Sequence, residues 1–136
     1  MDENETNVVE EESLGEKSIL ETVKALVGIG PNYNVFDDLI IIYTNSVFVN
    51  LAQLGIGPSA PFRISGRKEK WSDFIRDNDA FIHMVEPYVG FKVRLMFDPS
   101  LSSAVQNSID KTTAELEWRM IAQVETPPVD NVFDEL

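Results

Sequence analysis

The sequence predicts a mainly α-helical protein: a small domain of about four helices, with a short β-hairpin or projecting loop and extended terminal arms. Three observations support this fold class. Apolar residues recur at helical spacing along the body of the chain. Residues 81–97 are apolar on nearly every side, which is typical of a helix buried by its neighbours. Both ends are acidic and carry few apolar side chains.

Composition limits the protein to one modest core, since the chain has 136 residues and is 43% hydrophobic. The absence of cysteine excludes disulfides, cysteine metal sites and thiol chemistry, and fits a reducing compartment or a particle assembled in one. No apolar run approaches the roughly 18 residues that a membrane helix needs. The acidic first twenty residues are unlike a secretory or transit signal, so we expect a soluble intracellular product without membrane contact.

The net charge of −12 is concentrated in the two ends of the chain. Residues 1–16 carry seven acids and no Lys or Arg, and residues 125–136 carry four acids and no base. The body between them has 11 bases and 12 acids and is therefore nearly neutral. We predict an acidic N-terminal arm at 1–16, a helical domain at 17–124 and an acidic C-terminal arm at 125–136. Such arms disfavour general affinity for duplex DNA.

The first helix is expected from Ser18, which forms a capping-box pattern with Glu21, to about Val27. Asp37 is the predicted N-cap of the next helix. Residues 39–54 are rich in β-branched side chains and would also fit two strands. We favour a helix, because sixteen residues pass without a turn signal and the apolar positions keep helical spacing. Gly55 is placed to end it.

Residues 57–70 read as a hairpin or projecting loop, followed by one helical turn at residues 71–75. Residues 77–79 offer several caps for the apolar helix, whose thin polar stripe would include Gly90. Pro87 either kinks one continuous helix or opens a second one. Asp98-Pro99 ends this segment. Ser102 or Ser103 then caps a last helix, whose apolar stripe is interrupted by two threonines, Thr112 and Thr113.

No catalytic, cofactor-binding or metal-binding residues are predicted. His83 is the only histidine, and no Gly-x-Ser-x-Gly motif accompanies it, so an exposed or interface role is favoured over a catalytic triad. Asp37 and Asp38 read as helix-start residues rather than metal ligands. Glu115 and Glu117 point to different sides of their helix and do not form a catalytic pair.

The candidate functional residues are protein-interface positions in two segments. Residues 63–76 have a net charge of +3 and are interleaved with Phe62 and Trp71. They form either a solvated loop or a docking element for an acidic partner, such as the arm of a neighbouring copy. The second segment is the C-terminal arm, whose apolar side chains can anchor it. The candidates are Arg63, Arg67, Lys68, Lys70, Arg76, Val129, Val132, Phe133 and Leu136.

Several short motifs occur in order along the body: Ile-Tyr-Thr-Asn-Ser-Val-Phe (42–48) with Gln53-Leu54-Gly55, Trp71-Ser-Asp-Phe74, and Lys92-Val-Arg-Leu-Met-Phe-Asp-Pro99. With these motifs the chain resembles the head–tail connector (adaptor, or head-completion) proteins of tailed bacteriophages. The resemblance covers about residues 18–120, and none of its motifs is catalytic. Residues 1–16 and 125–136 depart from the compact family pattern.

The resemblance implies a structural protein of the virion neck, assembled in the host cytoplasm, and not an enzyme. Copies would form a ring, expected to be a dodecamer, below the portal protein, with DNA only as passing cargo in the channel. The ring would dock a tail-side neck or tail-terminator component. The alternative is a small acidic phage protein that binds and regulates a host protein. Its support is the net charge alone, and the acids lie in the arms rather than over the folded face.

Overall fold

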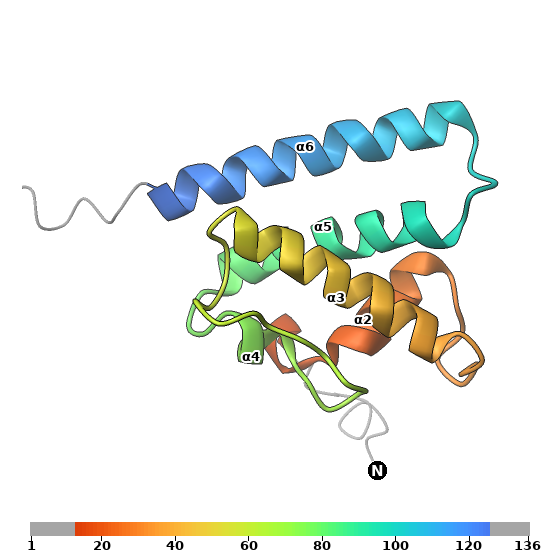
Figure 1. Ribbon diagram of the computed structural model, residues 1–136, viewed down its shortest axis with the longest axis horizontal. Coiled ribbons are helices and arrows are strands. Elements are labelled where there is room, and N and C mark those ends of the chain that lie inside the picture. The colour runs from red at the N-terminus through yellow and green to blue at the C-terminus, as the bar shows by residue number, and fades with distance from the viewer. Residues whose placement is uncertain (1–12, 126–136) are drawn as a thin grey trace, which may run out of the picture.

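The computed structural model describes residues 13–125, which form a helical domain without strands in that range (Figure 1). The fold class is confirmed. Residues 55–70 form a loop rather than a hairpin, and the β contact within the described range is an isolated bridge between Ser18 and Lys70. The elements are η1 (Leu14–Glu16, a 3-10 helix), α2 (Ile19–Val27), α3 (Asp37–Gln53), α4 (Trp71–Phe74), α5 (Asp79–Phe97) and α6 (Ser103–Glu125).

Helix α5 is the centre of the domain, and α2, α3, α4, α6 and η1 all contact it. Figure 1 shows α6 running along one side of α5, while α2 and α3 lie on another side. The helix continues through Pro87, so the alternative of two separate helices is wrong. The Asn78 side chain caps it by accepting a hydrogen bond from the Phe81 amide at 3.1 Å.

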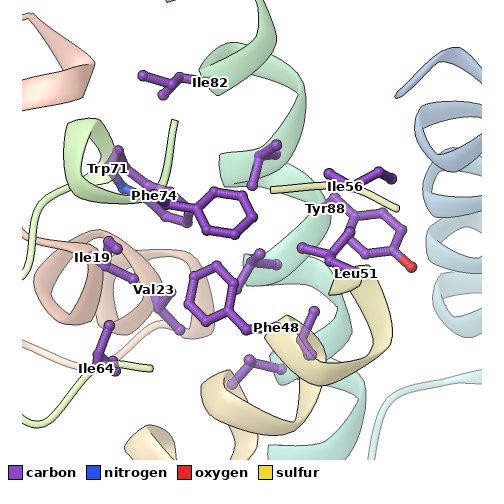
Figure 2. Packing of buried hydrophobic residues seen from close by; sticks show 14 of the residues in the cluster. Ile19, Val23, Phe48, Leu51, Ile56, Ile64, Trp71, Phe74, Ile82 and Tyr88 are labelled. Carbon is purple, nitrogen blue, oxygen red and sulfur yellow. The ribbon is translucent and has the colours of Figure 1, made fainter. Parts of the chain in front are cut away.

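Aromatic rings from three segments fill the core between α2, α3 and α5. Phe48 of α3 packs against Phe62, with ring centroids 5.0 Å apart. It also packs against Phe74 at 4.8 Å, and Trp71 lies beside these two rings (Figure 2). The Trp71 indole N–H donates to the Thr22 hydroxyl at 2.8 Å, so its polar atom is satisfied inside the core. The predicted helical turn at residue 71 is therefore confirmed, and both its aromatic residues are buried.

Several predicted helix ends are confirmed, and one is wrong. Ser18 accepts a hydrogen bond from the Glu21 amide at 3.4 Å, and α2 ends at Val27. Gly55 has a φ of +79° just after α3, as a C-terminal glycine requires. Asp37 is the first residue of α3 and makes no N-cap bond, because Phe36 occupies the cap position. The Asp37 carboxylate instead forms an ion pair with the Lys24 ammonium group.

The surroundings of α5 differ from side to side. Val85, Val89 and Val93 are fully buried, whereas Phe91 and Leu95 are half-buried and Met96 is exposed. The expectation of burial all round is therefore too strong. Gly90 was placed on the polar stripe, and this placement is wrong, since it is buried where α5 meets α2.

Helix α6 packs against α5. Ser102 caps its N-terminus by accepting from the Val105 amide at 3.2 Å. Ile109, Thr113 and Met120 are its buried residues. The Thr113 hydroxyl donates to the Ile109 carbonyl at 2.9 Å, so this threonine continues the buried stripe that it was expected to interrupt.

Tyr88 joins three helices through its hydroxyl group. The Tyr88 hydroxyl donates to the Glu117 carboxylate of α6 at 2.7 Å and accepts from the Asn50 side chain of α3 at 3.1 Å. Burial and the neighbouring Glu117 carboxylate raise the pKa of Tyr88 above its ordinary value. The hydroxyl points toward α6 in Figure 2 and remains a donor throughout the physiological pH range.

Gly90→Ala should destabilise the domain, because a Cβ at this position would lie 2.2 Å from Leu26 Cδ1 and 2.9 Å from Leu26 Cβ. Overpacking of this kind costs about 1–3 kcal/mol, which outweighs the gain of about 1 kcal/mol from replacing a helical glycine by alanine. Urea unfolding measures the change.

Gly30→Ala is the matched control, since a Cβ there meets nothing within 4 Å, and it should be close to neutral. A Leu26→Ala background removes the contacts with Cδ1 and Cγ but keeps the one with Cβ at 2.9 Å, so it should reduce the loss caused by Gly90→Ala. An equal loss of stability in both backgrounds would show that the contacts with Leu26 Cδ1 and Cγ are not the cause.

Candidate interaction surfaces

A buried lysine is the centre of the main polar cluster. Lys24 of α2 is only 1% exposed, and its Nζ lies 2.8 Å from the Asp37 carboxylate and 3.1 Å from Asn34 Oδ1. The Pro31 carbonyl is a weaker acceptor at 3.5 Å. The cluster thus joins the end of α2 to the start of α3. Burying an ammonium group requires this pairing, because an isolated buried charge is strongly unfavourable.

Arg67 completes the cluster from the loop that precedes α4. Its guanidinium group donates to Asn34 Oδ1, lies 3.4 Å from the Asp37 carboxylate and 3.7 Å from the Glu21 carboxylate. We refer to Lys24, Asn34, Asp37 and Arg67 as the Lys24 cluster. Part of the predicted basic docking element therefore holds the subunit together.

The loop around Arg67 is also fastened by its own hydrogen bonds. The Glu69 carboxylate accepts from the Ser65 amide at 3.0 Å, the Ser65 hydroxyl at 2.7 Å and the Gly66 amide at 3.3 Å. Burial acts to raise the pKa of Glu69, but these hydrogen bonds outweigh it and lower the pKa. Lys70 Nζ lies 3.1 Å from the Glu16 carboxylate. The loop is thus docked onto η1 and α2.

Three of the predicted cations lie on the surface. Arg63, Lys68 and Arg76 are exposed, and none of them has an ion-pair partner within residues 13–125. Arg76 lines a hollow of about 330 Å³ near the end of α6, together with Phe81 and Val124. The predicted basic candidates are therefore divided into two that support the fold, Arg67 and Lys70, and three that face outward. The predicted tail candidates Val129, Val132, Phe133 and Leu136 lie outside the described residues.

An exposed apolar stripe follows the outer side of α3. Leu39, Ile42 and Val49 are all exposed at helical spacing, with Ile42 at 62%. Val35 and Phe36 extend the stripe in front of the helix. We call these five residues the α3 outer face. Sequence reasoning assigned apolar residues of this helix to the core and did not separate this second apolar side.

A hollow of about 260 Å³ lies at the edge of the α3 outer face. Its walls come from α3 and α5, and its lining is mainly apolar. Lys92 is the charged residue in the lining of this hollow, and its Nζ lies 5.7 Å from the centre of the Tyr88 ring. The lining residues are Ser46, Val47, Asn50, Lys92, Leu95 and Met96.

The described residues do not assemble a recognisable reaction centre or metal site. Among residues 13–125 there is no group of three or more His, Cys, Asp or Glu side chains that could hold a metal ion. His83 is exposed on α5. No helix in the same range is long and apolar enough to cross a membrane.

A family model described as phage connector protein matches residues 19–127, which is most of the chain and nearly all of its described helices. No curated protein and no solved structure matches the chain.

Asp37→Asn should lower the free energy of unfolding by about 3 kcal/mol, because it leaves the Lys24 ammonium group buried without a carboxylate. Asn34 and Pro31 still accept from Lys24, which keeps the expected loss near the lower end of the range for broken buried pairs. Chemical denaturation at pH 7 measures it.

Asp38→Asn is the matched control, because Asp38 is exposed in the same first turn of α3. It removes the same charge near the helix N-terminus and should cost less than about 1 kcal/mol. Similar losses from the two variants would show that the helix dipole, rather than the Lys24 cluster, accounts for the effect of Asp37.

Proposed function

The chain belongs to the phage connector protein family, and on this premise we propose that it forms a ring below the portal protein of a tailed phage. The family match over residues 19–127 carries this proposal. It confirms the resemblance to head–tail connector proteins and gives the protein a structural role in the virion. The ring, expected to contain twelve copies, would extend the DNA channel and dock the next neck or tail component.

The described surface supports a role in assembly. Leu39, Ile42 and Val49 are exposed on one side of α3, and α5 also exposes Met96. Exposed apolar side chains that gather on one side of an element are typical of sites that another protein covers. A connector needs several such faces, because each copy contacts its neighbours and the components above and below.

The charge distribution supports contacts between the acidic terminal segments and the basic surface residues of the body. The body is nearly neutral, while the terminal segments hold eleven of the 23 acids. Arg63, Lys68 and Arg76 present cations on the surface of the same body. We propose that these cations receive an acidic segment of a neighbouring copy or of the portal. The C-terminal segment, with Val129, Val132, Phe133 and Leu136 as anchors, is proposed to contact the portal.

The second candidate, a small acidic protein that binds and regulates a host protein, has the net charge of −12 as its support. The two functions differ in one observable. A connector associates with portal protein and is found in virions, whereas a regulator stays monomeric without portal affinity and is absent from purified particles. Mass photometry of the chain with and without portal rings separates them.

Charge reversal at Arg63 and Lys68 together should weaken assembly on portal rings without lowering the melting temperature, because neither side chain pairs with another described residue. Arg67→Glu is the contrasting variant and should lower the melting temperature, because it opposes Asp37 and Glu21. Pull-down on immobilised portal, with thermal melts of each variant, measures both. Unchanged assembly combined with lost DNA binding would show that these cations serve nucleic acid.

Deleting residues 126–136 should leave a folded subunit that binds portal poorly, because the deletion removes the proposed anchors and three of the acids while the described helices remain. Deleting residues 2–12 removes six acids and should spare portal binding. Pull-down at moderate salt compares the two truncations. Normal portal attachment by the C-terminal truncation would move the portal contact elsewhere on the subunit.

A further inference from the structure

We propose that the outer side of α6 in one copy docks onto the α3 outer face of a second copy, with Trp118 entering the hollow beside Met96. The inference rests on the proposed function in assuming that copies assemble, and it assigns the two faces that meet. One face is the apolar stripe Leu39, Ile42 and Val49 with its adjoining hollow. The other is the side of α6 that faces away from α5.

The α3 outer face is a receptor surface by its shape and composition. Leu39, Ile42 and Val49 are exposed on one side of the helix with Ser46 between them, and the hollow between α3 and α5 offers about 260 Å³ beside Ser46. The walls of this hollow include the Leu95 and Met96 side chains, which adapt to an inserted ring. Large aromatic side chains are the usual anchors for such a hollow at the centre of an interface.

Trp118 is the side chain of the described chain best suited to fill it. It is 70% exposed, the most exposed aromatic side chain in the described range. At 3.6 residues per turn it lies on the opposite side of α6 from the buried Thr113 and Met120. It therefore projects away from its own subunit, and it makes no ring contact there with another aromatic residue of residues 13–125.

Charge favours the same pairing. Lys92 lines the hollow, and Glu125 lies seven residues after Trp118 on α6, whereas Glu115, three residues before it, is paired with Arg119 at 2.7 Å. Glu117 is bonded to Tyr88 inside the subunit, so the outward charges of α6 are three acids, Asp110, Glu115 and Glu125, against two bases, Lys111 and Arg119. An α6 that brings Trp118 into the hollow would also bring carboxylates toward the Lys92 ammonium group.

The two faces lie on different elements and point in different directions, which determines the kind of assembly. Both α3 and α6 pack against α5, and Figure 1 shows them covering different sides of it. Each copy can therefore offer its α6 to one neighbour and its α3 to another. Such a heterologous contact closes into a ring or continues as a filament, whereas pairing of α3 with α3 would stop at a dimer.

The absence of cysteine allows a direct test by cross-linking. Three variants that keep the Trp118 anchor are compared at high protein concentration and on portal rings: Ser46→Cys in the wall of the hollow, Ala114→Cys one turn before Trp118, and the double variant, each treated with a short bismaleimide. The double variant should give a ladder of covalent multimers, and an equimolar mixture of the two single variants should give dimers. Each single variant alone should remain uncross-linked. Ala25→Cys with Ser59→Cys, two exposed positions outside α3 and α6, measures the background of exposed pairs.

The other possible results separate the pairing from the proposed function. Dimers from Ser46→Cys alone would show an isologous α3 contact. No ladder from the double variant, while the wild-type chain is multimeric, would place the interface elsewhere. A chain that stays monomeric alone and on portal rings would remove a second copy as the occupant. A normal ladder without portal affinity would instead refute the proposed function and leave the α6–α3 contact standing.

Tryptophan fluorescence gives an independent readout, because Trp71 is fully buried and Trp118 is exposed in the single subunit. On assembly, Trp118 emission should shift to the blue and acrylamide quenching should fall. Trp118→Phe removes that change and, by shortening the anchor, should weaken self-association at least several-fold. The same variant should keep its melting temperature, since the side chain is outside the core. Persistent quenching of Trp118 in the assembled state would overturn the assignment.

Discussion

The burial of α5 is the constraint on which the other helices depend. A soluble helix that carries Val85, Tyr88, Val89 and Val93 needs cover along its length, and α2, α3 and α6 provide it. Gly90 lets α2 approach closely enough to do so, and the Tyr88 hydroxyl links α3 and α6 across the same helix. The cover is unequal. The side of α5 toward Met96 stays exposed, and that side borders the α3 outer face.

The Lys24 cluster divides the basic segment, because Arg67 is bonded within the subunit while Arg63 and Lys68 face outward. The Asp37 and Asn34 side chains each contact both the Lys24 ammonium group and the Arg67 guanidinium group. These contacts hold the loop that carries Arg67 beside α2 and α3. Such a pair stabilises little beyond its desolvation cost, but it fixes which segments lie together. Once Arg67 is committed to the fold, the outward-facing cations Arg63 and Lys68 are held on an anchored loop instead of a flexible one.

Local chemistry determined which features could be predicted from the sequence. Ser18, Val27, Gly55 and the turn at Trp71 follow from caps, glycine conformation and aromatic spacing within a few residues, and all were predicted correctly. Gly90 and the Lys24 cluster were missed because they depend on contacts between helices distant in the chain. Lys24 gave one available signal, since it lies between Leu20 and Val27 on the apolar side of α2. The candidate surfaces were only partly predictable, because sequence periodicity cannot say which apolar side of α3 is covered.

The two apolar sides of α3 are the strongest reason to regard the subunit as part of a larger assembly. Its inner side, with Ile40, Val47 and Leu51, is sufficient to pack against the domain. The fold does not need Leu39, Ile42 and Val49 to be apolar, and an isolated subunit gains no stability from exposing them. Their burial by a neighbour would release that free energy only on assembly. Because the receptor face and the projecting Trp118 belong to different helices, one subunit cannot satisfy both, and the contact extends from copy to copy.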